Sequence, residues 1–197
     1  MTHTLTPYDG DCSSIPDWRV LVDRFYTPDS EARNILIAHS KAVSDFALAI
    51  NRQKNLGLAP EEIEFAAMLH DIGIVGTKAP GIGCYGDKPY IMHGVIGADM
   101  LRDCGAPEWS ARVAERHTGS GLTADDIKRQ SLPLPLDRSL VPQTLLEKLI
   151  CYADKFFSKR PGQLYTPKNI SQVIKEMSGH GTESLERFMD LHKVFGD

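Results

Sequence analysis

Six histidine and aspartate side chains stand where they could act together on a metal ion: His39, His70, Asp71, His93, His117 and Asp154. Neutral imidazole and carboxylate groups suit Fe, Mn, Zn or Co better than they suit metals that prefer thiolate ligands. A carboxylate next to a ligating histidine can also bridge two ions, and the doublet His70-Asp71 offers that arrangement. The set is therefore large enough for a dinuclear centre that keeps open positions for water and substrate.

These six groups lie on or beside the apolar stripes of five separate predicted helices. A histidine or an ionised aspartate that faces a core is costly unless it is hydrogen-bonded, paired or bound to a metal. A single such residue would be explained as a hydrogen-bonded interior histidine or as a capping aspartate. Six together favour a shared metal site.

The elements that must position these groups are predicted to be helices, because apolar residues recur at spacings of three and four with almost no strand alternation. The longest helix runs from Ser30 to Asn55, with Asp29 or Ser30 as its N-cap and His39 on its apolar stripe. Pro60 opens the helix that ends at the His70-Asp71 doublet. Further helices are predicted at 17–26, 90–105, 107–119, 123–130, 144–158, 167–177 and 182–195. The fold class is therefore all-α.

The composition is that of an ordinary globular protein. The chain has 197 residues, 42% of them hydrophobic and 24% charged, with a net charge of −4. We expect one domain over 1–197, with a core at about 30–160 on which the N-terminal segment and the C-terminal helices pack. The charge gives no reason to expect general nucleic-acid binding or a membrane surface. The N-terminus lacks the apolar core of a signal peptide, and no apolar run reaches the roughly 20 residues of a membrane span.

Four cysteines are scattered along the chain without a CxxC spacing: Cys12, Cys84, Cys104 and Cys151. They are expected to be free thiols in a reducing compartment, which predicts a cytoplasmic protein.

The ordered series from His39 to Asp154, with the run HDIG at 70–73, resembles the HD-domain superfamily of metal-dependent phosphohydrolases. The resemblance implies an HD-domain helical bundle. The segments HGVIGADML, ERHTGSGLT and YADKF are also similar to small stand-alone HD proteins, relatives of which are fused to archaeal RNA-modifying enzymes. That similarity suggests a lineage and leaves the substrate open.

The resemblance also implies the role of each residue. In HD proteins the first histidine, the His-Asp doublet and the last aspartate hold one metal, which here would be His39, His70, Asp71 and Asp154. Members with two further histidines hold a second metal, so His93 and His117 would bind it with Asp71 as the bridge. The implied cofactor is two divalent transition-metal ions, Fe or Mn, with Zn, Co or Ni as the alternatives. The oligomeric state is left open.

The implied activity is hydrolysis of a nucleotide or another small phosphate ester, of monoester or diester type. Asp71 would be the catalytic residue that orients a metal-bound hydroxide, because bound metals lower the pKa of water toward about 7. Two features depart from the family. Ile74 stands directly after HDIG, where several HD phosphohydrolases carry lysine, and Thr118 stands where some dinuclear relatives carry another histidine.

A phosphate-facing cation must therefore come from elsewhere in the chain. The candidates are Lys78, Lys88, Arg116, Lys155, Lys159 and Arg160, of which proximity favours Lys78 and Lys155 as substrate-binding residues. Most lysines and arginines are exposed, so a solvated surface residue is the favoured explanation for each candidate, with Lys78 and Lys155 as the preferred exceptions. The glycine-rich segment 75–89 fits either a lid over the site or a plain connection.

Two other functions stay open. The six-residue series also resembles the mixed-valence di-iron HD oxygenases, in which the centre activates dioxygen instead of water. A catalytically silent HD module that senses a nucleotide is the third alternative, and the intact residue series argues against it.

Overall fold

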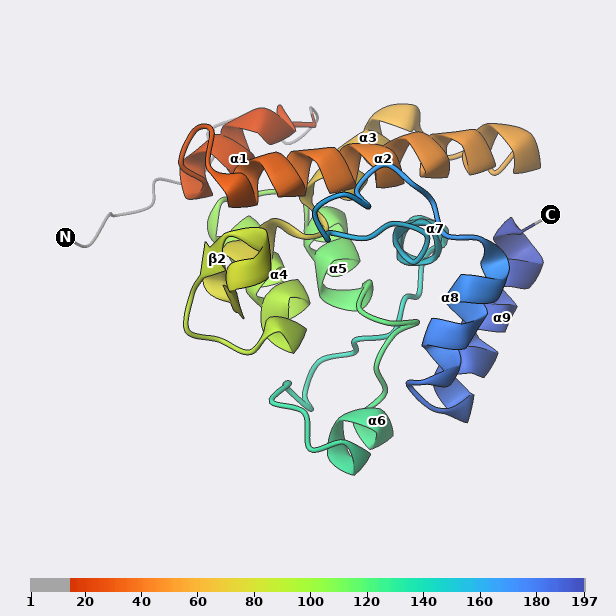
Figure 1. The fold of residues 1–197 in the computed structure, drawn as a ribbon. Helices are drawn as coiled ribbons and strands as arrows, with labels where there is room; N and C mark the ends of the chain where they lie inside the picture. The colour runs from red at the N-terminus through yellow and green to blue at the C-terminus, as the bar shows by residue number, and fades with distance from the viewer. Residues whose placement is uncertain (1–14, 197) are drawn as a thin grey trace.

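The computed structural model describes residues 15–196. In this range the regular structure is almost entirely helical, which confirms the all-α fold (Figure 1). The α-helices are α1 (Trp18–Phe25), α2 (Glu31–Lys54), α3 (Pro60–Leu69), α4 (His93–Asp103), α5 (Glu108–Arg116), α6 (Ala124–Arg129), α7 (Leu145–Asp154), α8 (Ile170–Ser178) and α9 (Thr182–Phe195). No helix within 15–196 combines the length and the apolar character that a membrane crossing requires.

The helix ends follow the capping signals of the sequence. Ser30, and not Asp29, is the N-cap of α2, since its side chain accepts a hydrogen bond from the backbone N–H of Arg33. Thr123 and Thr144 form capping boxes at the starts of α6 and α7. Gly105 has the left-handed φ of 71° expected after the end of α4.

Two apolar clusters meet at the middle of α2. One joins α2, α3 and α7 to the C-terminal helices through residues such as Leu149 and Phe188, and the other joins α1, α2, α3 and α4 through Phe65 and Leu101. On α2, Leu36 belongs to the second cluster and Val43 to the first. His39 lies between them, so the boundary of the two clusters holds a polar side chain.

The segment 75–89 is folded rather than a loose loop. It contains the 3-10 helix η2 (Pro80–Ile82) and an antiparallel pair of two-residue strands, β1 (Lys78–Ala79) and β2 (Cys84–Tyr85). Two further 3-10 helices border it, η1 (Ile72–Gly76) before it and η3 (Tyr90–Met92) after it. The Lys78 N–H donates to the Lys88 carbonyl at 2.8 Å, which closes the hairpin. The structure therefore gives this segment a fixed shape. Whether it opens and closes as a lid stays a prediction.

Gly73 of the HDIG run has a packing role. A Cβ at this position would lie 2.2 Å from the carbonyl oxygen of His93 and 2.3 Å from the backbone nitrogen of Gly97, both on α4. The φ of Gly73 is not positive, so glycine is required here by close approach and not by a left-handed turn. Because α4 packs directly on η1, His93 is brought next to Asp71.

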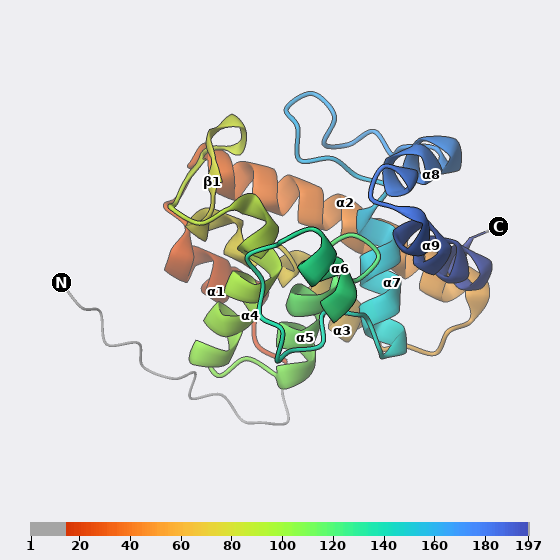
Figure 2. The same cartoon turned by 90° about the horizontal axis from the view of Figure 1, so that it is seen from below.

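The segment between α5 and α7 lies below the other helices in Figure 1 and in front of α4 and α5 in Figure 2. It contains α6 and a proline-rich connector that has no helix or strand of its own. A small apolar cluster of its own, built on Val95, Ile127, Leu134 and Leu140, holds it against α4. Cys84, Cys104 and Cys151 are free and buried, as expected, whereas Cys12 and His3 lie outside the described residues.

Candidate metal centre

The fold brings all six predicted side chains to one buried place. His39 comes from the middle of α2, the doublet His70-Asp71 from the end of α3, and His93 from the first turn of α4. The remaining two are His117, directly after α5, and Asp154, the last residue of α7. Each of the six is at most 7% exposed.

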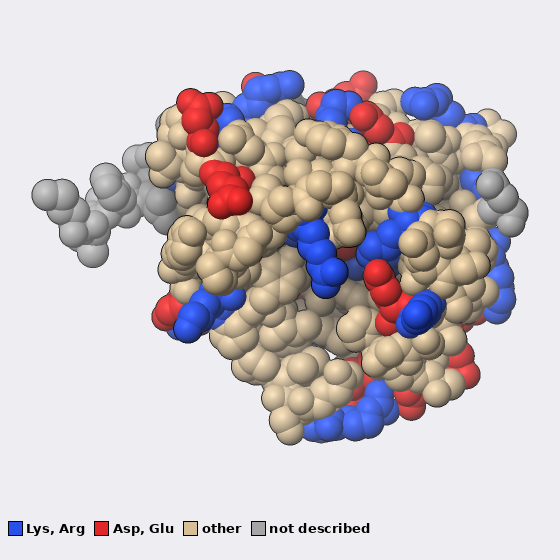
Figure 3. Space-filling model, in the orientation of Figure 1, with Lys and Arg blue, Asp and Glu red and all other residues tan. Residues whose placement is uncertain are grey.

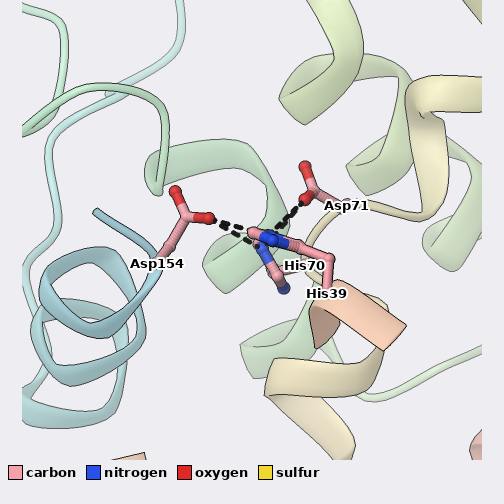
Figure 4. A group of neighbouring side chains, drawn as sticks. All are labelled: His39, His70, Asp71 and Asp154. Carbon is pink, nitrogen blue, oxygen red and sulfur yellow. Dashed lines mark hydrogen bonds and ion pairs between the residues drawn. The ribbon is translucent and has the colours of Figure 1, made fainter. Parts of the chain in front are cut away.

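Four of these residues form a first group around a common point (Figure 4). The Nε2 atom of His39 lies 3.1 Å from Asp71 Oδ2 and 3.0 Å from Asp154 Oδ1. The Nε2 atom of His70 lies 3.1 Å and 3.4 Å from the same two oxygens. Two imidazole nitrogens and two carboxylate oxygens therefore converge.

A second group shares Asp71 with the first. Oδ1 of Asp71, the oxygen that does not face the first group, lies 3.3 Å from His93 Nε2 and 3.4 Å from His117 Nε2. The two histidine Nε2 atoms are 3.0 Å apart. Asp71 thus presents one carboxylate oxygen to each group, which is the geometry of a bridging ligand.

The hydrogen bonds of these histidines fit a bound cation. The Nδ1–H groups of His70, His93 and His117 donate to the backbone carbonyls of the residues three positions earlier, at 2.6 to 2.8 Å. This tautomer leaves a lone pair on each Nε2, as in most metal-ligating histidines. Two such lone pairs that face each other at 3.0 Å repel unless a cation lies between them. The atoms His70 Nε2 and Asp71 Oδ1 are also buried without a hydrogen bond, so the donor set fits divalent metal ions.

His39 differs from the other three histidines. Its Nδ1 atom is buried and has no hydrogen-bond partner in the described structure. The backbone therefore does not fix its orientation, and the contacts of Nε2 with the two carboxylates do so instead.

Charge and burial act in opposite directions at this site. Burial disfavours the ionised form of Asp71, yet Lys159 and His70 hold the pKa of this carboxyl well below its usual range. Burial likewise opposes ionisation of Asp154, whose pKa is held low by Lys155 and Lys159. Burial lowers the pKa of His93 to about 3 despite the pull of Asp71. Ionised carboxylates and the neutral imidazole of His93 are the forms in which these groups bind metals. Burial opposes a charge on His70, but Asp71 and Asp154 raise its pKa to about 9, so a metal ion that binds at His70 Nε2 displaces a proton.

Two lysines contact the carboxylates. The Nζ atom of Lys159 lies 2.6 Å from Asp71 Oδ2. Burial opposes the positive charge of Lys159, but the negative charge of Asp71 outweighs it, so the pKa of Lys159 is raised. Lys155 Nζ lies 2.6 Å from Asp154 Oδ2 and donates to the His117 carbonyl at 3.0 Å. Lys78 is exposed on β1. The substrate-binding roles predicted for Lys78 and Lys155 stay predictions.

Sequence reasoning missed the contact that Lys159 makes. It was one of several candidate cations, but α7 ends at Asp154, so helical spacing does not determine where the next side chains point. No sequence signal distinguishes Lys159 from its neighbour Arg160.

A pocket of about 630 Å³ lies over this lysine. Its walls are formed by the hairpin segment at Ala79 and Ile82, by Tyr90, and by the irregular segment that follows α7. The charged residues in its lining are Lys159, Arg160, Lys168 and Glu176. Figure 3 shows blue side chains gathered around the hollow in the middle of this face. A pocket with more cations than anions thus lies next to the centre, and Lys159 connects the two through its contact with Asp71.

Comparison with known proteins identifies the family. The HD domain matches residues 36–158, which is most of the chain and includes all six side chains of the centre. The chain therefore belongs to the HD-domain family, a superfamily of metal-dependent phosphohydrolases. No solved structure matches the chain at a significant level.

Three curated relatives are archaeal. A protein of Methanocaldococcus jannaschii, named only as uncharacterized, is 35% identical over 80% of this chain and 85% of its own length. Proteins of Thermoplasma volcanium and Picrophilus torridus, both named tRNA (cytidine(56)-2'-O)-methyltransferase, are 31% and 28% identical. The matches cover 91% and 64% of this chain but only 46% and 33% of those two relatives. This chain thus spans less than half of the two methyltransferase-named proteins.

Proposed function

We propose that the protein is a metal-dependent phosphohydrolase that acts on a nucleotide or another small phosphate ester. The observation that carries the proposal is the placement of Asp71, whose two oxygens face two convergent groups of histidine nitrogens. A pocket lined by Lys159, Arg160 and Lys168 lies next to this carboxylate, because Lys159 Nζ is 2.6 Å from Asp71 Oδ2. A dinuclear site beside a cationic pocket suits displacement at a phosphoryl group.

Each residue of the site would have a specific role in the reaction. His39, His70, Asp71 and Asp154 would hold one divalent ion, and Asp71, His93 and His117 the other. The ions would supply Lewis acidity and a coordinated water of lowered pKa. Asp71 would orient that water between the two groups. Lys159, which lines the pocket and lies beside Asp71, would offset the charge of a phosphoryl oxygen.

The methyltransferase name of two relatives does not carry over to this chain. The match covers less than half of each of those proteins, and the residues gathered here are metal ligands by type. The net charge of −4 also disfavours a long RNA as substrate, because RNA binding depends on neutralising many phosphates. Short RNA oligonucleotides nevertheless belong in the substrate panel.

The test compares metal-loaded enzyme on nucleotides, sugar phosphates and short RNA under aerobic and anaerobic conditions. We expect phosphate release that does not depend on oxygen. Turnover only with oxygen and iron would replace this proposal with the oxygenase alternative, and ligand binding without turnover would favour a sensor.

Two lysine variants test the substrate contacts. Lys78→Ala and Lys155→Ala should each lower kcat/KM by an amount equivalent to about 1.5–3 kcal/mol, the value of a charge-assisted hydrogen bond. Metal content should be unchanged in Lys78→Ala, and it is measured in Lys155→Ala because Lys155 also contacts Asp154. Lys193→Ala, at an exposed position on α9, is the control. Equal activity of a lysine variant and this control would remove that lysine from the substrate site.

A further inference from the structure

A second pocket reaches the metal centre at His93. It has a volume of about 270 Å³ and lies between the start of α4, the segment around α6 and the start of α9. His93, which belongs to the second metal group, forms part of its wall. Tyr90 and His180 line both this pocket and the larger cationic pocket. The two pockets therefore adjoin each other at these two residues.

Hydrogen bonds and an ion pair between the α6 segment and α9 hold the walls of the pocket in place. Ser120 Oγ donates to the Ser184 carbonyl at 2.7 Å, and Arg187 Nη2 donates to Asp126 Oδ2 at 2.6 Å and to the Gly121 carbonyl at 3.1 Å. Asp126 is itself fixed by the capping box with Thr123. Side chains that are tied in this way cannot fill the space between the two walls.

The lining combines apolar walls with a few polar groups. Ile91, Leu122 and Leu132 form the apolar part and are braced by the small cluster beneath them. Gln130 and the guanidinium of Arg187 also line it, and Arg187 Nε is buried without a hydrogen-bond partner. A buried donor without a partner favours a ligand that carries an acceptor.

The size limits what can enter. Pockets for whole drug-sized ligands measure about 300–1,000 Å³, so 270 Å³ holds one ring system and not a complete substrate. The pocket carries few charges apart from the Arg187–Asp126 pair, which already neutralises itself. A sugar phosphate or a polyanion would leave its polar groups unpaired here.

We propose that this pocket is a subsite for the leaving group, which takes a planar, mostly apolar ring of nucleobase size whose edge carries hydrogen-bond acceptors. The proposal rests on the proposed phosphohydrolase function for the position of the phosphoryl group. That group lies at the metal centre and toward Lys159, while the ring carried by the esterified alcohol enters past His93 and lies between Leu122 and Leu132. The subsite therefore selects ring-bearing phosphate esters over sugar and glycerol phosphates.

The test combines hydrolysis with direct binding. Leu132→Trp places a large side chain on the pocket wall, and Gln130→Ala removes a polar group at an exposed position that should not affect folding. Leu136→Trp is the matched control, because Leu136 lies on the same segment, is 52% exposed and does not line the pocket. The substrates are nucleoside monophosphates, p-nitrophenyl phosphate and glycerol phosphate. Binding of adenosine, guanosine, cytidine and uridine is followed by methyl NMR of metal-loaded protein.

We expect Leu132→Trp to lower kcat/KM for ring-bearing esters by about tenfold or more, the scale of a pocket mismatch, while glycerol phosphate and the Leu136→Trp control change little. At least one nucleoside should shift the methyl signals of Leu122 and Leu132. Equal losses on all esters, or no binding of any of the four nucleosides, would overturn the subsite. Nucleoside binding without hydrolysis of any ester would instead overturn the phosphohydrolase proposal and leave the subsite standing.

Discussion

Removal of the two histidines of the second group should halve the metal content of the protein. His93→Ala with His117→Ala leaves Asp71 alone in that group, whereas the first group keeps all four of its side chains. Wild-type protein should therefore hold about two ions per chain and the double variant about one. Elemental analysis of protein purified without added metal measures this directly.

The same change has a calculable effect on stability. A metal ion whose free concentration is 100 times its dissociation constant stabilises the fold by about 2.7 kcal/mol. In a domain of this size, 1 kcal/mol of stability corresponds to a change in Tm of roughly 2–4 °C. The rise in Tm on metal loading should thus be smaller by roughly 5–11 °C in the double variant. Each protein is compared with its own chelator-treated form, so the cavities left by the removed imidazoles do not enter the difference.

A variant at an exposed histidine is the control for this experiment. His180→Ala, between α8 and α9, should keep both ions because His180 belongs to neither group. The reasoning is refuted if wild-type protein binds a single ion and the double variant binds it equally well.

Three further predictions follow from single contacts. Asp71→Ala should abolish activity and lower metal content at both sites, whereas Asp154→Ala should mainly weaken the first; equal, mild effects in elemental analysis would contradict the bridging role. Gly73→Ala should destabilise the protein by more than the ~1 kcal/mol of a typical substitution, since its Cβ would meet the α4 backbone at 2.2 Å, and denaturant unfolding measures this. Burial opposes ionisation of Asp126, but hydrogen bonds from Thr123 and the charge of Arg187 outweigh it, so the pKa of this carboxyl is lower in the folded protein. Ionised Asp126 therefore adds to the free energy of unfolding above the unfolded pKa of about 4, and this stabilisation is lost as the pH falls. Asp126→Asn should therefore cost about 1.5–3 kcal/mol at pH 7 and progressively less below pH 4, and an equal cost at both pH values would contradict it.

Much of the fold could be predicted from local patterns. Caps such as Ser30, Thr123 and Thr144, and prolines such as Pro60, act on neighbouring backbone groups, so the sequence shows where helices begin without knowledge of their packing. Apolar spacing likewise identified the buried faces. The six metal-type residues were found because each is a costly exception on such a face.

Contacts between distant segments could not be predicted in the same way. Sequence spacing singled out Lys155 beside Asp154, but the structure also brings Lys159 to Asp71 through a turn after α7 that has no periodicity. The need for glycine at position 73 likewise comes from α4, which is distant in sequence and packs against it.

The sequence by itself thus determined the helices, the family resemblance and the residues that could bind metal, because these depend on short-range backbone chemistry and on residue type. The tertiary structure alone decided that the two oxygens of Asp71 face different histidine groups, and that a cationic pocket lies over Lys159 while a more apolar pocket lies beside His93. Orientation and cavity shape are set by how α3, α4, α7 and α9 pack against one another. Because packing depends on all of these segments together, it cannot be predicted from any single stretch of the sequence.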